Sequence, residues 1–487
     1  MSISFSKSFR KTADGAIWGF LAEALMLPTG LITTGYLTRN LGPEGYGIFT
    51  LAATLVGWVT FSTTSLFSRT TIKFVSEAND WRPVGTTVLR LNLACGVGAM
   101  LLLWFAAEPI SMLLGEPKLK IYLQIFSLEP LFFILARAHR FILIGTGNFR
   151  KQSIPSAVRW LARAVLIILL VESGLSIPGA ILGSVAAAIL ELAIYRFYVR
   201  PPLFFPSSFP AKQLWNYATP LFLSALSMQL FSKIDLFSLT ALGGTATEAG
   251  IYGAAQSLCI VPGLFALSFS PLLLSTLGHM LKNGQDQAAQ EMGSHSMRLI
   301  FGMLPFAAMA SGAADEVVVL IFGSAFSPTA PLLSLLIFAK VAAVMISIAS
   351  IIMIAVDKPT WTLVLSCPLP ILAGVGHFLL IPHLGAIGAA SVTTALSVLG
   401  ALVAITSVYY VFGVFPPVGT LGRSLPLCGL AYVAAMMLPT PGFWVIPKLL
   451  AIMVMIAIGF GLLGEFSSRE IEVLRSFLWR RALLKQN

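Results

Sequence analysis

Long apolar stretches that are almost free of charge run through the whole sequence. Residues 327–355, for example, contain Lys340 as their single ionisable side chain. Of the 487 residues, 57% are hydrophobic and 10% are charged, whereas a soluble domain has about 25% charged residues. A hydrocarbon layer is spanned by ~20 apolar residues in a helix, because every backbone N–H and C=O must be bonded within the segment. The sequence therefore predicts an all-α, polytopic membrane protein.

Proline, glycine and charged residues divide the apolar sequence into about fourteen candidate transmembrane helices. They cover residues 13–40, 45–76, 84–106, 118–144, 153–172, 176–199, 213–242, 247–279, 291–313, 327–355, 360–381, 385–412, 422–438 and 444–464. Nearly all connections between them are short, so none is predicted to form a separate catalytic or nucleotide-binding domain. The chain also lacks a GxxxxGK[ST] loop for ATP. A membrane polysaccharide polymerase or glycosyltransferase is therefore only a distant alternative, since such an enzyme would be expected to have a sizeable outward loop.

The 31 Lys and Arg residues are distributed unevenly between the two sides of the predicted bundle. If the N-terminus is cytoplasmic, the outward connections hold only Arg39, Lys118, Lys120 and Lys448. This asymmetry follows the positive-inside rule and predicts that both termini are cytoplasmic. The net charge of +11 is then a topology signal beside anionic lipid, and no nucleic-acid partner is predicted.

Two parts of the chain resemble each other at a nearly constant spacing. "GPEGYGIFTLAATL" (Gly42 to Leu55) resembles "EAGIYGAAQSL" (Glu248 to Leu258), and "PGAILGSVAAAIL" from Pro178 resembles "LGAIGAASVTTAL" from Leu384. A duplication of six spans, an even number, gives both copies the same orientation and predicts two lobes around a cleft. The predicted divisions are an N-terminal lobe at 1–206, a C-terminal lobe at 207–415, two additional spans at 416–466 and a cytoplasmic amphipathic tail at 467–487.

Three segments resemble a known family of transporters. They are "IDLFSLTALGGTATEAGIYGAA" (Ile234 to Ala255), "LTRNLGPEGYGIFTLAATL" (Leu37 to Leu55) and "RFILIGTGNFRKQS" (Arg140 to Ser153). The chain is similar to the oligosaccharide flippase (Wzx-like, polysaccharide biosynthesis) branch of the multidrug/oligosaccharidyl-lipid/polysaccharide exporter superfamily. The resemblance covers essentially the whole chain. It implies fourteen spans, with two six-helix lobes related by an axis along the membrane normal and two additional helices.

The resemblance also implies a function in a bacterial inner (plasma) membrane. The expected cargo is an undecaprenyl-diphosphate-linked oligosaccharide that moves from the cytoplasmic to the outer leaflet for O-antigen, capsule or exopolysaccharide biosynthesis. Members of the family are thought to use a proton or sodium gradient and a polar or cationic cavity. The expected partners are the lipid-linked oligosaccharide, membrane lipids and polysaccharide assembly proteins.

Four ionisable residues within the spans are candidates for a substrate cavity or a coupling site, because a charge at the middle of a membrane costs about 2.5–3.5 kcal/mol. Asp235 matches the family's aspartate in the first span of the second lobe. On one continuous helix Lys233 and Asp235 would lie ~200° apart, and the serine-rich face of that helix favours Asp235 as the cleft residue. Glu23 and Lys340 lie near the centres of their spans. A structural ion pair is the alternative interpretation for each.

Arg69, Arg137 and Arg140 lie toward the predicted cytoplasmic mouth. Guanidinium groups can bind the phosphates of a diphosphate headgroup bidentately, so these arginines are candidate anion-binding residues. Alternatively, they extend to the lipid interface as topology signals. Glu191 and Arg163 are interpreted as a pair between two helices.

Two other transport functions remain alternatives at this stage. A drug/cation antiporter should have a carboxylate-rich cavity, whereas Arg and Lys are at least as numerous as Asp and Glu within these spans, which favours an anionic cargo. A peptidoglycan lipid-precursor flippase would also carry an anionic cargo. The scattered Cys and His residues lack metal-ligand spacing, so neither a metal site nor a cofactor is predicted.

Overall fold

A computed structural model describes residues 22–201, 229–358 and 360–465, together with Lys212, Leu214 and Leu226. The predicted tail at 467–487, the first part of the predicted span at 13–40 and most of residues 202–228 lie outside the described residues. Within the described residues the regular elements are all helices, which confirms the predicted all-α class.

Several helices are long enough to cross a membrane more than once. Among the described residues, seven helices have the length and apolar composition of a span, or up to nine if each of two bent pairs is one span. Helix α2 (Met26–Glu77) has 52 residues but is broken at Gly42, where φ is 67°. Helix α17 (Pro368–Phe412) has 45 residues and is broken at Gly385, where φ is 56°. The break at Gly42 falls between two predicted spans, and the break at Gly385 falls at the first residue of the predicted span 385–412. The count of fourteen spans stays a prediction.

The described chain divides into two compact units. Unit 1 comprises residues 1–261, 321–332 and 360–396, and unit 2 comprises residues 262–320, 333–359 and 397–487. Unit 1 contains segments from both copies of the predicted repeat, whereas unit 2 contains segments of the second copy and of the residues that follow it. The division into the lobes 1–206 and 207–415 stays a prediction.

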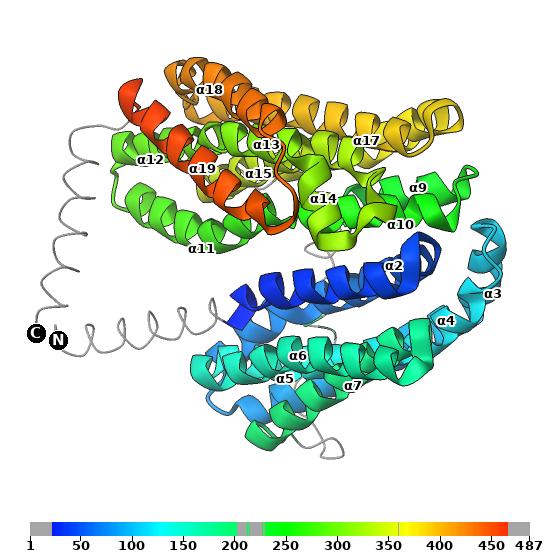
Figure 1. Cartoon of the computed structure of the whole chain (residues 1–487). Helices are drawn as coiled ribbons and strands as arrows, with labels where there is room; N and C mark the ends of the chain where they lie inside the picture. Colours follow the sequence, from blue (N-terminus) through cyan, green and yellow to red (C-terminus); the bar gives the residue numbers. More distant parts are fainter. Residues whose placement is uncertain are drawn as a thin grey trace, which may run out of the picture. The chain divides into compact units, whose positions relative to one another are not determined.

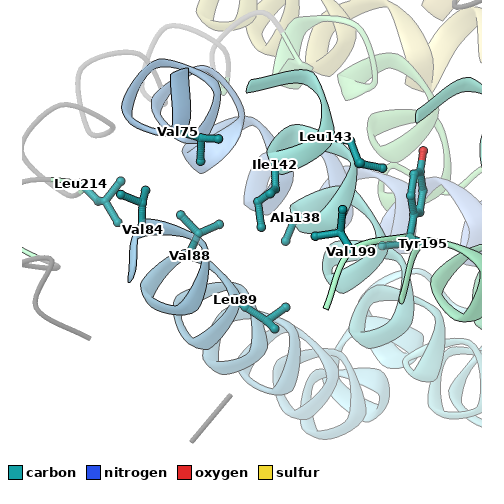
Figure 2. Packing of buried hydrophobic residues seen from close by; sticks show 11 residues of the cluster. Val75, Val84, Val88, Leu89, Ala138, Ile142, Leu143, Tyr195, Val199 and Leu214 are labelled. Carbon is teal, nitrogen blue, oxygen red and sulfur yellow. The ribbon is translucent and has the colours of Figure 1, made fainter. Parts of the chain in front are cut away.

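Most helices of unit 1 come from the first part of the chain. They are α2, α3 (Trp81–Leu113), α4 (Leu119–Phe126), α5 (Leu128–Gly145), α6 (Phe149–Leu170), the π-helical turn η1 (Val171–Leu175) and α7 (Ser176–Tyr198). Helix α5 contacts α2, α3 and α7, and α6 lies along α7 (Figure 1). In Figure 2, Val84 and Val88 of α3 lie beside Ala138 and Ile142 of α5 in one buried apolar cluster.

The rest of unit 1 comes from three later segments. They contain α9 (Ile234–Ala241), α10 (Ala246–Leu258), the 3-10 turn η2 (Ser324–Phe326), α16 (Thr360–Ser366) and the part of α17 up to residue 396. Helix α10 contacts α2 extensively. The two segments that resemble each other in sequence, at 42–55 and 248–258, therefore lie in helices that pack together.

Glycine makes this close approach between α2 and α10 sterically possible. A Cβ added at Gly47 would lie 1.7 Å from the carbonyl oxygen of Ala246, and one added at Gly250 would lie 2.2 Å from that of Pro43. Real Cβ atoms do not approach backbone oxygens so closely, so only glycine permits this packing without a shift of one helix. The repeated Tyr-Gly pair thus supplies two glycines of the crossing, because a Cβ added at Gly253 would lie 2.5 Å from Cγ2 of Thr50 on α2. Tyr46 and Tyr252 are both buried.

Unit 2 contains the remaining helices. They are α11 (Ile260–Lys282), α12 (Asp286–Gly302), α13 (Leu304–Gly312), α14 (Ala314–Phe322), α15 (Thr329–Ala355), α18 (Val418–Met437), the 3-10 turn η3 (Gly442–Trp444) and α19 (Val445–Leu462). Helices α11, α14 and α15 each have one end in unit 1, and α17 is divided between the two units after residue 396. Apolar residues of α13, α18 and α19 form one buried cluster.

A polar cluster joins three helices of unit 2 near the end of α19. The Glu465 carboxylate lies 2.6 Å from Nε of Arg298 and 2.7 Å from Nη1 of Arg423, and it accepts a hydrogen bond from Thr420 at 2.5 Å. Burial raises the pKa of Glu465, but the hydrogen bonds from Thr420, Arg423 and Arg298 together hold this pKa below its ordinary value. Glu465 therefore connects α12 and α18 to the end of α19.

Candidate functional site

Asp235 lies in the first turn of α9 and is only 2% exposed. Its Oδ2 accepts hydrogen bonds from the hydroxyl of Tyr252 at 2.8 Å and from Nε2 of Gln256 at 2.9 Å. Its Oδ1 accepts from the backbone N–H of Leu236 at 2.8 Å. A buried carboxylate is stable only when such donors replace its hydration. Asp235 is therefore a buried carboxyl group that accepts hydrogen bonds from two side chains of α10.

His377 of α17 completes the polar surroundings of Asp235. Its side chain is fully buried, and its Nε2 lies 3.4 Å from the hydroxyl of Thr393 on the same helix. The negative charge of Asp235 also acts on the His377 ring. We name Asp235, Tyr252, Gln256, His377 and Thr393 the Asp235 cluster. No group of three or more metal-ligating side chains is found among the described residues.

The Asp235 cluster belongs to one copy of the repeat only. The spacing between Tyr46 and Tyr252 places Thr29 at the position that corresponds to Asp235, and Thr50 at the position that corresponds to Gln256. The first copy thus has neutral hydroxyl groups where the second copy has a carboxylate and an amide. The buried charge is a specific feature of the second copy.

Lys233 does not lie on the same regular helix as Asp235. Residues 232 and 233 form a turn, and Lys233 has non-helical backbone angles (φ −133°, ψ −9°) directly before α9. The ~200° separation expected on one continuous helix therefore does not apply, and that prediction was wrong. Ser232 donates a hydrogen bond back to the carbonyl of Gln229 at 2.9 Å, which fits a chain that turns here. Lys233 itself is half-buried.

A second buried polar cluster lies among α5, α6 and α7. Glu191 of α7 is fully buried, and its carboxylate lies 3.3 Å from Nε of Arg159 and 3.9 Å from Nη2 of Arg137. Arg159 also reaches Glu129 at 3.4 Å. The guanidinium carbons of Arg137 and Arg159 lie 4.5 and 4.4 Å from the centre of the Phe133 ring, where the ring face attracts cations. We name these five residues the Glu191 cluster.

Arg140 pairs with Glu23, another predicted site residue. The two side chains approach to 2.6 Å, and Nε of Arg140 donates to Oε1 of Gln152 at 3.0 Å. The Glu23 side chain keeps 39% of its exposure, whereas that of Arg140 keeps 17%. The structure therefore brings together Glu23 and Arg140, which were predicted separately from the sequence. The guanidinium group of Arg140, predicted to bind an anionic cargo, is paired with the carboxylate of Glu23.

The other predicted residues lie apart from these clusters. Lys340 is half-buried on α15 of unit 2 and forms no ion pair with the residues described there. Arg69 lies in α2, but its side chain lies outside the described residues. The suggested pair of Glu191 with Arg163 is wrong, because Arg159, one helical turn earlier, pairs with Glu191, while Nε of Arg163 donates to Ser184 at 3.2 Å.

Sequence reasoning missed several residues of both clusters. Tyr252 carried a usable signal, because it belongs to the repeated Tyr-Gly pair, and Gln256 follows it by about one helical turn. Arg159 lies close to Arg163 in a basic stretch, with no local pattern that would favour one over the other. His377 is far from Asp235 in sequence, so no spacing could connect the two.

These features define a multi-pass helical membrane protein with ionised side chains buried among its spans. Residues 12–273, more than half of the chain, match the family described as "Polysaccharide biosynthesis protein". The chain belongs to this family, as the sequence resemblance implied.

Two curated relatives have printed names that concern saccharide transport. The succinoglycan biosynthesis transport protein ExoT of Rhizobium meliloti (strain 1021) is 23% identical over 325 residues, which cover 66% of this chain and 65% of that protein. A putative O-antigen transporter of Shigella flexneri is 24% identical over 194 residues, which cover 38% of this chain and 46% of that protein. The matched region thus spans less than two thirds of the length of either relative.

Solved structures confirm the fold. The lipid II flippase MurJ in an inward closed conformation superposes with a TM-score of 0.77 and 17% identity, covering 91% of this chain and 97% of that one. An inward-facing multidrug resistance MATE transporter of the MOP superfamily gives a TM-score of 0.63 with 15% identity, covering 82% of this chain and 94% of that one. The chain therefore has the helical fold of this superfamily.

Proposed function

We propose that this protein is a flippase for an undecaprenyl-diphosphate-linked oligosaccharide. It moves the lipid-linked sugar from the cytoplasmic to the outer leaflet of a bacterial inner membrane by alternating access, and both of its termini are cytoplasmic. The observation that carries the proposal is the match of residues 12–273 to the polysaccharide biosynthesis family. The names of the two curated relatives, a succinoglycan and an O-antigen transporter, support the choice of cargo.

The chemistry of the first part of unit 1 supports an anionic cargo. Arg137, Arg140 and Arg159 lie on neighbouring helices, and their side chains are at most 17% exposed. Of their carboxylate partners, Glu23 is the most exposed at 39%. A diphosphate that enters this region displaces Glu23 from Arg140 and keeps a charge-assisted pair in its place. The site can thus exchange an internal anion for the headgroup without leaving Arg140 unpaired.

The Asp235 cluster supports coupling to an ion gradient. A buried carboxylate is costly unless donors replace its hydration, and Asp235 accepts hydrogen bonds from Tyr252 and Gln256. Binding of H⁺ or Na⁺ at this carboxylate would neutralise one buried charge in each transport cycle. Polysaccharide assembly proteins are the proposed partners on the membrane surface.

Two rival cargoes follow from the structural relatives. The MATE likeness makes an organic cation the first rival, and the MurJ likeness makes a peptidoglycan lipid precursor the second. The test reconstitutes the purified protein in proteoliposomes with each of three cargoes: undecaprenyl-diphosphate oligosaccharide, lipid II and ethidium. The proposal expects the first to cross fastest. If lipid II or ethidium crosses faster, the proposed cargo is wrong and the faster compound is the better candidate.

A further inference from the structure

Helix α10 is held by two different neighbours through two different faces. Gly250 lies on the face that contacts α2, whereas Tyr252 and Gln256 reach Asp235 on α9. At ~100° per residue, Tyr252 and Gln256 lie within ~40° of each other on the helix, and Gly250 lies ~120–160° away from them. Helix α10 therefore cannot rotate or slide on one neighbour without changing its contact with the other.

The contact with α2 leaves little freedom. Gly47 and Gly250 bring the backbones together so closely that an added Cβ at either would overlap a carbonyl oxygen. The first turn of α10 is also fixed, because Glu116 accepts a hydrogen bond from the backbone N–H of Ala246 at 3.1 Å and Thr245 caps the helix. Two closely packed surfaces have one well-fitting arrangement, so α10 either lies fully against α2 or separates from it.

The contact with α9 depends on charge. Hydrogen bonds to an ionised carboxylate are roughly twice as strong as those between neutral groups. Both α10 donors converge on the same oxygen, Oδ2 of Asp235. A neutral side chain at this position holds both donors more weakly, and an asparagine whose nitrogen replaces Oδ2 cannot accept from either of them. The charge of Asp235 also acts on His377 of α17, and Lys233 lies two residues before Asp235.

We propose that Asp235, Tyr252 and Gln256 form a charge-controlled latch that keeps α10 seated on α2. In this latch, Tyr252 and Gln256 are positioning residues: they transmit the charge state of Asp235 to the crossing of the two repeated segments. Neutralising Asp235 weakens the hold of α9 on α10 and frees α10 to leave α2. This inference rests on the proposed function for its role in transport, because it connects an ion-binding carboxylate to a movement between the two copies of the repeat.

The test measures the α2–α10 separation directly, without any cargo. Spin labels are attached at Glu44→Cys on α2 and Thr247→Cys on α10, two exposed positions, in a background whose four native cysteines are replaced. Distance distributions are recorded by pulsed electron paramagnetic resonance in lipid nanodiscs. The variants are Asp235→Asn, Tyr252→Phe and Gln256→Leu. Thr240→Val is the matched control, because its hydroxyl is equally buried on α9 but bonds only to its own helix.

The latch predicts that each of the three variants lowers the short-distance population several-fold, while Thr240→Val leaves it unchanged. The double variant Asp235→Asn/Gln256→Leu should shift no further than Asp235→Asn, because the two residues act through one contact. A general loss of packing would instead add the two effects. Distributions that superpose on the parent in Tyr252→Phe and Gln256→Leu overturn the latch, even if Asp235→Asn fails to fold. If the distances shift as expected but no lipid-linked sugar crosses the membrane of the liposomes, the latch is supported and the proposed cargo is wrong.

Discussion

Replacing Glu191 by glutamine should destabilise the protein by about 3 kcal/mol. The carboxylate is fully buried between Arg159 at 3.3 Å and Arg137 at 3.9 Å, and the side chains of these arginines are 8% and 12% exposed. Removing one member of a buried pair costs about 3–5 kcal/mol, because it leaves an uncompensated charge. Glu129 remains on Arg159, and the Phe133 ring remains below both guanidinium groups, which places the cost at the lower end.

The free energy of unfolding can be measured by denaturant titration in mixed micelles. Glu44→Gln is the matched control, because Glu44 also pairs with a basic residue, Lys118, but both side chains are more than 60% exposed. Such an exposed pair contributes about 0–1 kcal/mol. Adding Arg137→Gln to Glu191→Gln should recover part of the loss, since Arg137 pairs with Glu191 and its replacement removes one of the unpaired charges. A Glu191→Gln protein as stable as the parent would refute an ionised Glu191 held between two arginines.

Three further predictions concern Glu23, the crossing of α2 and α10, and Glu465. Glu23→Gln should tighten binding of a diphosphate-linked sugar analogue up to ~5-fold, because a partly exposed ion pair is worth about 1 kcal/mol. Arg140→Gln should weaken binding of the same analogue. Equal affinities of the variants and the parent in a binding titration would contradict the displacement of Glu23. Gly47→Ala should disrupt the α2–α10 contact and lower the unfolding temperature, whereas Gly57→Ala on the same helix, where an added Cβ meets open space, should not. Folding lowers the pKa of Glu465, so its stabilisation should be present at neutral pH and be lost as pH falls from its pKa in the unfolded chain, about 4.3, through its pKa in the folded protein. The difference in free energy of unfolding between the parent and Glu465→Gln should therefore shrink on acidification. A constant difference would contradict a stabilising, ionised Glu465.

The helical class could be predicted from the sequence because the hydrocarbon of the membrane offers no hydrogen bonds to the backbone. A chain inside hydrocarbon must satisfy its backbone within each segment, so the apolar stretches determined the helical class. Glycine lies at two of the helix breaks, at Gly42 in α2 and at Gly385 in α17. The break at Ser232 and Lys233 carried no proline or glycine, and it was missed.

The partners of the buried charges were harder to predict than the charges themselves. Asp235 and Glu191 stood out because an ionised group in an apolar stretch is costly. Which cation or donor each one contacts depends on helix rotation and packing, and a shift of one turn exchanges Arg163 for Arg159. The charge of Asp235 acts on His377 only because the fold brings α9 and α17 together, so nothing in the local sequence of His377 could indicate this interaction.

The proposed function is tested most directly by measuring leaflet exchange of its cargo. Purified protein is reconstituted with a fluorescent undecaprenyl-diphosphate oligosaccharide in the inner leaflet, and sugar that reaches the outer leaflet is detected by a membrane-impermeant lectin. The account predicts exchange well above that of protein-free liposomes, acceleration by a proton or sodium gradient, and loss of this acceleration in Asp235→Asn. Exchange no faster than in protein-free liposomes, with or without either gradient, would contradict the account.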